Sequence, residues 1–227
     1  MAEPTESRAD RVGSHYRGDA ATDYLAYQGR IGALGAELNR WKFEPHLRPD
    51  DAVVDFGCGT GALLERLDVA SKTGVEVSEP ARRQAQARGL TVVASTGELA
   101  DASADVAFSN HALEHTLAPL DELRELRRVL RPGGRLVLWL PLDDWRAQRR
   151  PLAGDPDHHL YAWTPKLLAN LLAEAGFEVA SCTVVTRAWP PRAHRLTWLP
   201  RPVFDALGAA WSVLRKRRQL AAVAYRG

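Results

Sequence analysis

Two groups of histidine and acidic side chains are the residues of this chain best suited to proton transfer or metal binding. His111, Glu114 and His115 are spaced so that all three share one face if a helical turn starts at His111. His158 and His159 follow in a later polar stretch. Imidazole and carboxylate groups from two loops can bind one divalent cation, and an ordinary imidazole can act as a general base near neutral pH.

A structural role is the alternative for these residues. Glu114 and His115 would then cap the next helix or orient its loop, and His159 would be an ordinary loop histidine. Ligand spacing by itself is compatible with both interpretations, because it carries no geometry.

A buried strand that breaks into a glycine turn predicts a ligand site. Two valines lead into Asp55, and glycines follow at positions 57, 59 and 61. Helical apolar spacing over residues 62–67 places this turn at a strand-to-helix junction, with free N–H groups facing a ligand. The spacing matches neither a GxGxxG turn nor a P-loop. Glu76 closes the following strand, where a carboxylate can bind both hydroxyls of a ribose.

The stretch VVDFGCGTG at residues 53–61, together with Glu76, resembles the first two motifs of class I S-adenosylmethionine-dependent methyltransferases. The resemblance runs over residues 53–179. It implies an α/β fold with a doubly wound, mostly parallel sheet, an antiparallel edge strand and an N-terminal helical cap. It also implies S-adenosylmethionine as the cofactor.

The resemblance further implies a set of cofactor-binding residues. These are Tyr24 and Arg30 in the cap, Asp55, Gly57, Cys58 and Gly59 in the turn, Glu76 and Val77 after the second strand, Ser95, Thr96 and Gly97 after the third, and Asn110 after the fourth. Arg30 would bind the methionine carboxylate, since guanidinium binds carboxylate bidentately. The alternative is that Tyr24 packs in the core and Arg30 is solvated. Ser95 replaces the usual Asp, so the adenine contact stays open.

Two narrower resemblances concern the histidines. The block at residues 111–115 looks like the ExxEH element of plant-type small-RNA 2′-O-methyltransferases, with His111 in place of the first Glu, and residues 159–164 are similar to their later His-x-Phe-x-Trp-Thr element. Ubiquinone-pathway O-methyltransferases carry a related Glu-His pair. The resemblance implies a site for Mg²⁺, Mn²⁺ or Zn²⁺ made by Glu114, His115 and His159, with His111 as a fourth candidate ligand.

Many methyltransferases carry the same Leu-Glu-His without a metal. The candidate catalytic residues are therefore His111, His115 and His159, and in a metal-free enzyme His111 or His159 is the expected base.

Composition limits the class of protein. The chain of 227 residues is long enough for one α/β domain, has a net charge of +2 and contains two cysteines. No stretch of about eighteen apolar residues occurs, so we expect a soluble, cytoplasmic protein. The near-neutral charge and the lack of an RNA-binding module argue against a nucleic-acid substrate. We divide the chain into a tail and helical cap (1–48), a catalytic core (49–188) and a C-terminal lid or edge segment (189–227).

Apolar periodicity predicts the elements that position these residues. Helices are expected over residues 80–88, 121–130 and 160–176, the last capped by Thr164, and strands over residues 90–94, 105–109, 135–140 and 177–186. One or two further helices are expected within residues 14–40.

The C-terminal segment is rich in tryptophan and arginine. An amphipathic helix is expected over residues 203–214, followed by a basic run at 215–218 and a last strand over 220–225. One interpretation is a lid over the acceptor, or a surface that contacts anionic lipid or a lipid-linked sugar. The other, favoured because charged runs are usually solvated, is a helix packed on the sheet.

The sequence thus predicts an O-methyltransferase for a small polyhydroxylated metabolite, with a sugar as the leading example. N- or C-methylation of a small metabolite without a metal is an alternative. A protein of another class, which binds the cofactor for regulation without turnover, is the third.

Overall fold

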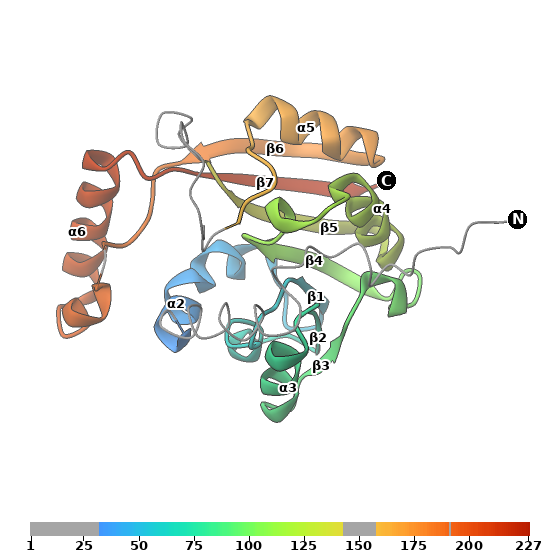
Figure 1. Cartoon of the computed structure of the whole chain (residues 1–227), viewed down its shortest axis with the longest axis horizontal. Helices are drawn as coiled ribbons and strands as arrows, with labels where there is room; N and C mark the ends of the chain where they lie inside the picture. Colours follow the sequence, from blue (N-terminus) through green and yellow to red (C-terminus); the bar gives the residue numbers. More distant parts are fainter. Residues whose placement is uncertain (1–31, 143–157, 191) are drawn as a thin grey trace, which may run out of the picture.

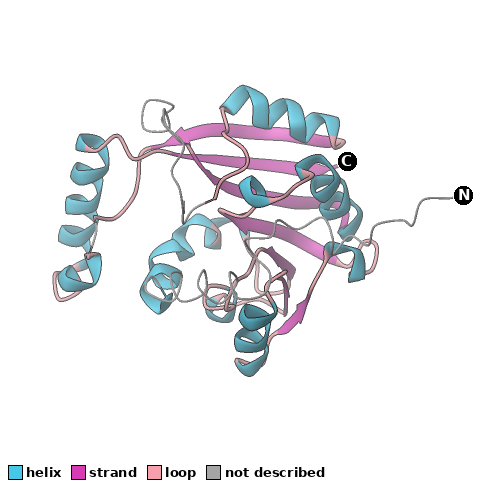
Figure 2. Ribbon diagram, viewed as in Figure 1, coloured by secondary structure: helices cyan, strands magenta, loops and turns pink. Residues whose placement is uncertain are grey.

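The computed structural model describes residues 32–142, 158–190 and 192–227. In this part of the chain seven strands form one sheet in the order β3-β2-β1-β4-β5-β7-β6, with helices on its faces (Figure 1, Figure 2). Neighbours among β1 to β5 pair in parallel, and β7 pairs antiparallel with both β5 and β6. The strands are β1 Ala52–Phe56, β2 Ser71–Val75, β3 Thr91–Val93, β4 Ala104–Asn110, β5 Leu130–Pro141, β6 Phe177–Val185 and β7 Gln219–Arg226. The predicted fold is confirmed, with its antiparallel pairing at the β6 edge.

Five α-helices occur in the described residues, together with short 3₁₀ turns. The α-helices are α2 Gly32–Asn39, α3 Glu79–Ala87, α4 Pro119–Val129, α5 Pro165–Glu174 and α6 Arg201–Leu214. The 3₁₀ turns are η3 Arg40–Lys42, η4 Glu44–His46, η5 Leu64–Arg66, η6 Thr96–Glu98, η7 Leu113–His115 and η8 Ala193–Leu196. The predicted cap at Thr164 is confirmed, since its hydroxyl accepts the N–H of Leu167 at 3.2 Å.

Alternation along β5 shows why both faces of the sheet are covered. Leu136, Leu138 and Leu140 pack into one buried cluster with side chains of α4 and α5, whereas Val137 and Trp139 pack into a second cluster on the other face. This second cluster is filled from the segment around η3, η4 and η5.

The carboxyl ends of the parallel strands meet at one edge of the sheet, where open α/β folds bind their ligands. β1 ends at Phe56, β4 at Asn110 and β5 at Pro141. Because β7 is antiparallel, its first residue, Gln219, pairs with Pro141 and lies at the same edge. Residues from the start and the end of the chain can therefore reach one site.

Two local predictions were wrong. The apolar run after the glycine turn forms only the 3₁₀ turn η5 instead of a helix. The histidine block does not begin a helical turn at His111: that residue has a left-handed backbone with φ of 57°, and the turn η7 starts at Leu113. His111 therefore does not share a face with Glu114 and His115.

Most of the predicted cap, including Tyr24 and Arg30, lies outside the described residues. Within those residues, no helix combines the length and the apolar character that crossing a bilayer would require.

Candidate functional site

The turn after β1 uses most of its own N–H groups. Gly57 and Cys58 both donate to the carbonyl of Val75, at 2.8 and 3.1 Å, and Gly61 donates to the carbonyl of Cys58. The expectation that these groups are free for a ligand was therefore wrong. Gly59 is the residue of the turn with open space beside it: its φ is 54°, and an added Cβ would meet no heavy atom within 4 Å.

Gly57 serves a different purpose in the same turn. Its φ is 79°, and an added Cβ would lie 2.3 Å from the Cβ of Ala112. The absence of a side chain lets the turn after β1 contact the loop after β4. The two halves of the site are thus held together at this glycine.

Glu76 braces the glycine turn from the end of β2. Its Oε2 accepts the N–H of Gly59 at 2.9 Å and its Oε1 accepts the N–H of Ser78 at 2.7 Å. Burial raises the pKa of Glu76, and these backbone hydrogen bonds oppose the rise. A carboxylate has further lone pairs, so Glu76 can also accept the hydroxyls of a ribose.

Asp55, in β1, and Cys58, in the turn itself, are both buried. Asp55 is 3% exposed, and burial, reinforced by the charge of Glu76, raises its pKa well above the ordinary value. Burial likewise raises the pKa of the Cys58 thiol, so this cysteine is no nucleophile. The Cys58 side chain packs with Ala85 and Val92.

Most polar side chains of the segment after β3 already have hydrogen-bond partners within the protein. The Ser95 hydroxyl accepts the N–H of Gly97 at 3.2 Å, while Glu98 accepts the N–H of Ser95, which forms a capping box. Thr96 is buried and its hydroxyl donates to Glu122 at 3.0 Å. By contrast Val77, after β2, is 38% exposed and offers an apolar surface to a ring.

A buried lysine that the sequence did not indicate lies beside the end of β4. Lys42 is 3% exposed, and its ammonium donates to Oδ1 of Asn110 at 2.8 Å and to Oε1 of Gln219 at 2.7 Å. The same Gln219 oxygen lies 3.0 Å from Nε2 of His111. Since the Gln219 amide nitrogen donates to the carbonyl of Arg187 at 2.5 Å, its oxygen faces the lysine and the histidine. Nε2 of His111 then carries the proton, and Nδ1 the lone pair.

Burial changes the pKa values of His111 and Lys42 and therefore the chemistry expected of them. Burial first, and the charge of Lys42 second, lower the pKa of His111 to about 3. The premise that His111 titrates near neutrality was therefore wrong. Burial lowers the pKa of Lys42 to about 7, and the charge of Glu114 opposes this shift.

Glu114, His115 and His159 come together as the sequence predicted. Each offers a ligand atom, and these atoms all lie within 4.8 Å of one another. Oε1 of Glu114, which is fully buried, is 3.8 Å from Nε2 of His115 and 4.0 Å from Nε2 of His159. His111, the fourth candidate, is not part of this group, because its ring is turned toward Gln219.

Backbone contacts hold the loop that carries His159 against η7. The N–H of Leu160 donates to the carbonyl of Glu114 at 2.9 Å, and Nδ1 of His115 lies 3.3 Å from the carbonyl of His158. With the proton on Nδ1, that contact is a hydrogen bond, and the lone pair on Nε2 of His115 is left on the side of Glu114 and His159, where it can bind a cation.

Comparison with known proteins decides the family. A family model described as a methyltransferase domain matches residues 27–181, more than half of the chain. A crystal structure from Thermotoga maritima, described as a SAM-dependent methyltransferase and possible histamine N-methyltransferase, has a TM-score of 0.59 and 25% identity, and the match covers 75% of this chain and 82% of that one. The chain belongs to the class I S-adenosylmethionine-dependent methyltransferases.

Curated relatives of this methyltransferase include two fungal proteins. An O-methyltransferase of Pyrenophora dematioidea is 32% identical over 80% of this chain and 79% of its own length. An O-methyltransferase of Penicillium expansum is 34% identical over 58% of this chain and 53% of its own length. The chain spans only 32–63% of the length of the first curated relatives that it matches.

Sequence reasoning missed Lys42 and Gln219 in the methyltransferase site. Lys42 gave no local signal, because lysine is rarely buried and its partners Asn110 and Gln219 are distant in the sequence. Gln219 gave no local signal, since its place depends on the antiparallel pairing of β7 with β5.

Proposed function

We propose that this methyltransferase transfers the methyl group of S-adenosylmethionine to a hydroxyl oxygen of a small polyhydroxylated metabolite, with a sugar as the leading example. The observation that carries the proposal is the approach of Glu114, His115 and His159 to one another beyond the end of β4. The names of two relatives, both O-methyltransferases, support oxygen as the methylated atom.

The three side chains fit a divalent cation. Separations of 3.8 and 4.0 Å between the Glu114 oxygen and the two imidazole nitrogens suit ligands whose bonds to one ion are about 2.1 Å long. Two imidazoles and a carboxylate favour Zn²⁺ or Mn²⁺ over Mg²⁺, which prefers oxygen ligands. When bound, such an ion lowers the pKa of a coordinated hydroxyl and positions it.

The chain's own residues have to align the reactants and dispose of one proton. In the transfer a carbon–sulfur bond breaks as a carbon–oxygen bond forms, and the hydroxyl proton must leave. The glycine turn and Glu76 position the donor, and the loop after β4 positions the acceptor. A His111 pKa of about 3 makes that ring a weak base, so His159 is the better proton acceptor if no metal binds.

Metal content and thermal stability test this proposal. The protein is stripped with a chelator, and bound metal and the thermal shift with S-adenosylhomocysteine are measured, alone and with Zn²⁺, Mn²⁺ or Mg²⁺ restored. We expect added metal to stabilise the protein, and we expect that stabilisation to disappear in the double variant His115→Ala, His159→Ala. The matched control is His194→Ala, an exposed histidine on η8. Stabilisation by S-adenosylhomocysteine that is indifferent to metal and to the double variant would contradict the metal site.

The alternatives make different predictions. For N- or C-methylation without a metal, S-adenosylhomocysteine should stabilise the protein and added metal should not. A regulatory protein would also bind S-adenosylhomocysteine, but a panel of acceptors incubated with S-adenosylmethionine would give no methylated product. We also propose that the protein is cytoplasmic and that its acceptor is not a nucleic acid.

A further inference from the structure

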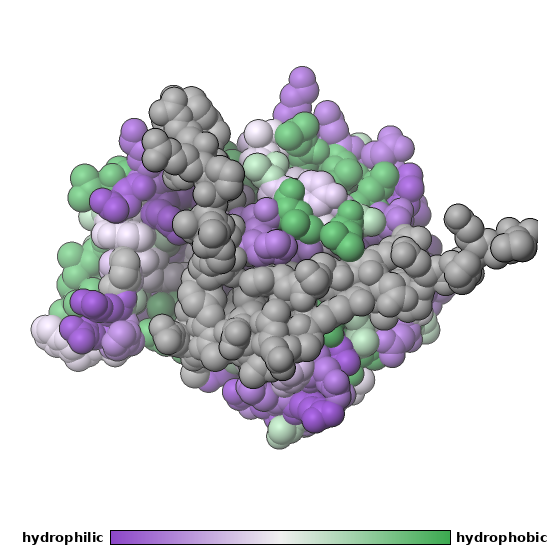
Figure 3. Space-filling model, in the orientation of Figure 1, coloured by the Kyte–Doolittle hydropathy of each residue, from purple (hydrophilic) through white to green (hydrophobic). Residues whose placement is uncertain are grey.

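The outward half of α6 is entirely apolar. Val203, Ala206, Leu207, Ala210, Val213 and Leu214 follow one face of the helix at helical spacing, and all of them are exposed. Val213 is 66% and Leu214 is 79% exposed. α6 stands at the left-hand edge of the molecule in Figure 1, and Figure 3 shows hydrophobic side chains over that region.

Asp205 and Ser212 face inward, whereas Arg201 in the first turn of α6 is exposed, so the outer face of this surface helix carries no polar residue beyond its first turn. The Ser212 hydroxyl accepts the N–H of Ala188 at 2.7 Å and is buried, and Asp205 lies 3.7 Å from Arg187 and 3.1 Å from Arg201. The predicted helix is present, but the prediction that it packs on the sheet was wrong: its buried Phe204 packs with Leu38 of α2 and Ala193 of η8. The apolar outer face of α6 is left without an explanation. Surface helices normally turn charged side chains to water.

Positive charge surrounds this face. Between Arg192 and Arg218 the chain has seven arginines or lysines and a single acidic residue, the inward-facing Asp205, although the whole chain has a net charge of only +2. The basic run at 215–218 is exposed along its length. Just before the helix, Trp198 is 78% exposed, a position that suits the interface between lipid headgroups and acyl chains.

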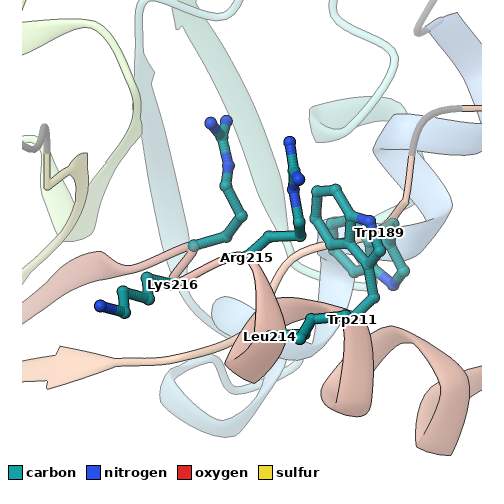
Figure 4. A pocket seen from close by; sticks show the side chains of 6 residues that line it. Trp189, Trp211, Leu214, Arg215 and Lys216 are labelled. Carbon is teal, nitrogen blue, oxygen red and sulfur yellow. The ribbon is translucent and has the colours of Figure 1, made fainter. Parts of the chain in front are cut away.

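A hollow of about 540 Å³ lies where α6 meets the basic run. Trp189, Trp211 and Leu214 line one part of it, and Arg215, Lys216 and Arg217 line the rest. Figure 4 shows the Arg215 side chain extending beside the two indole rings, while Lys216 points away from them. Aromatic surface next to several cations suits an anionic headgroup whose tail is apolar.

We propose that α6 and the basic run dock this protein on the surface of an anionic lipid bilayer. The apolar face of α6 enters the headgroup region, and the cations from Arg192 to Arg218 bind anionic lipids. With 14 residues, α6 is too short to span the bilayer, so it lies in the plane of the interface. The inference does not depend on the acceptor or the metal proposed above.

A second copy of the chain is the competing occupant, and the charges disfavour it. Two α6 helices packed side by side would place basic segments together in either orientation. In a parallel pair the two basic runs meet, and in an antiparallel pair each run meets Arg192 and Arg195 of the other copy. A lipid surface instead supplies the missing negative charge.

Vesicle co-sedimentation of the full chain tests the inference. The vesicles contain phosphatidylcholine alone or phosphatidylcholine mixed with phosphatidylglycerol. We expect binding to the mixed vesicles, weakened by salt. The double variant Leu207→Gln, Leu214→Gln should bind at least about tenfold more weakly, because two apolar side chains no longer enter the interface. Arg215→Gln, Lys216→Gln should weaken binding by roughly thirtyfold, from two lost headgroup interactions.

The controls remove groups of the same kind elsewhere. Leu167→Gln alters a leucine on α5 that is 55% exposed, and Arg83→Gln, Arg124→Gln removes two exposed cations from α3 and α4. Both should bind vesicles as the parent does. Absence of binding to the mixed vesicles, or equal losses in test and control variants, would overturn the inference. So would sedimentation velocity that shows a dimer dissolved by Leu207→Gln, Leu214→Gln, since α6 would then be an interface between copies.

Discussion

The ammonium of Lys42 donates a hydrogen bond of 2.7 Å to the side-chain oxygen of Gln219, 177 positions later in the chain. The same oxygen faces His111, so one amide joins the η3 turn, the end of β4 and the start of β7 at the edge that carries the site. This junction ties three distant segments together at the edge of the sheet where open α/β folds bind their ligands.

Removing the shared acceptor should destabilise the protein. Gln219→Leu leaves the buried Lys42 with Asn110 as its remaining acceptor, and we expect the free energy of unfolding to fall by about 1–3 kcal/mol. Denaturant unfolding measures the loss. The matched control is Gln86→Leu on α3, which removes one part-buried hydrogen bond of 3.3 Å and should cost less. Equal losses in the two variants would show that the lysine contact contributes little.

The depressed pKa of Lys42 predicts a pH dependence of stability. Between about pH 7 and pH 10.5 the unfolded chain keeps the proton that the folded protein has lost, so stability rises with pH through this range. Lys42→Met abolishes that contribution. The stability of the variant relative to the parent should therefore decline as pH rises, by at most about 1.4 kcal/mol per pH unit. Parallel pH profiles of the two proteins would contradict the assignment.

His111 predicts a dependence of the same sign at acid pH. Its pKa is about 3 in the folded protein and 6.5 ordinarily, so the unfolded chain takes up a proton first as the pH falls. Stability should decrease from about pH 6.5 toward pH 3, by up to about 1.4 kcal/mol per pH unit. His111→Asn, which tolerates the left-handed backbone, should flatten this decline, and His194→Asn should not. Denaturant unfolding over that pH range distinguishes the outcomes.

Alanine substitutions at two glycines distinguish an effect on cofactor binding from an effect of backbone strain. Gly59 and Gly89 both have positive φ, and an added Cβ would meet no heavy atom within 4 Å at either position. Alanine should cost each about 1–2 kcal/mol of stability. Only Gly59→Ala places a methyl group at the glycine turn, so it should weaken S-adenosylhomocysteine binding at least about tenfold in calorimetry. Unchanged affinity in Gly59→Ala would mean that the cofactor does not approach the turn there.

Much of the fold could be predicted from the sequence because the apolar periodicity is strong. The buried strand before Asp55 and the helix capped by Thr164 are examples in which local pattern and final structure agree. The face that α6 turns inward could not be predicted, since its apolar residues occupy both sides and Ser212 finds its partners in a distant segment.

The candidate site was predictable where residue types suited to metal binding lie in short motifs. Glu114, His115 and His159 were identified by type and spacing, and the structure brings them together. The orientation of His111 was not predictable, because it depends on the left-handed backbone of His111 itself and on Gln219, which comes from near the end of the chain. Lys42 was missed for the same reason, since its partner Gln219 is placed by the pairing of β7 with β5.

Product analysis after transfer of a labelled methyl group tests most directly the proposal that oxygen is methylated at a site organised by Glu114, His115 and His159. The protein is incubated with methyl-labelled S-adenosylmethionine and a panel of polyhydroxylated and amine acceptors, with and without chelator. We predict a product with its methyl on a hydroxyl oxygen, lost with chelator and in His115→Ala, His159→Ala, but not in His194→Ala. A methyl group found on nitrogen or carbon, or transfer that continues unchanged in chelator, would contradict the account.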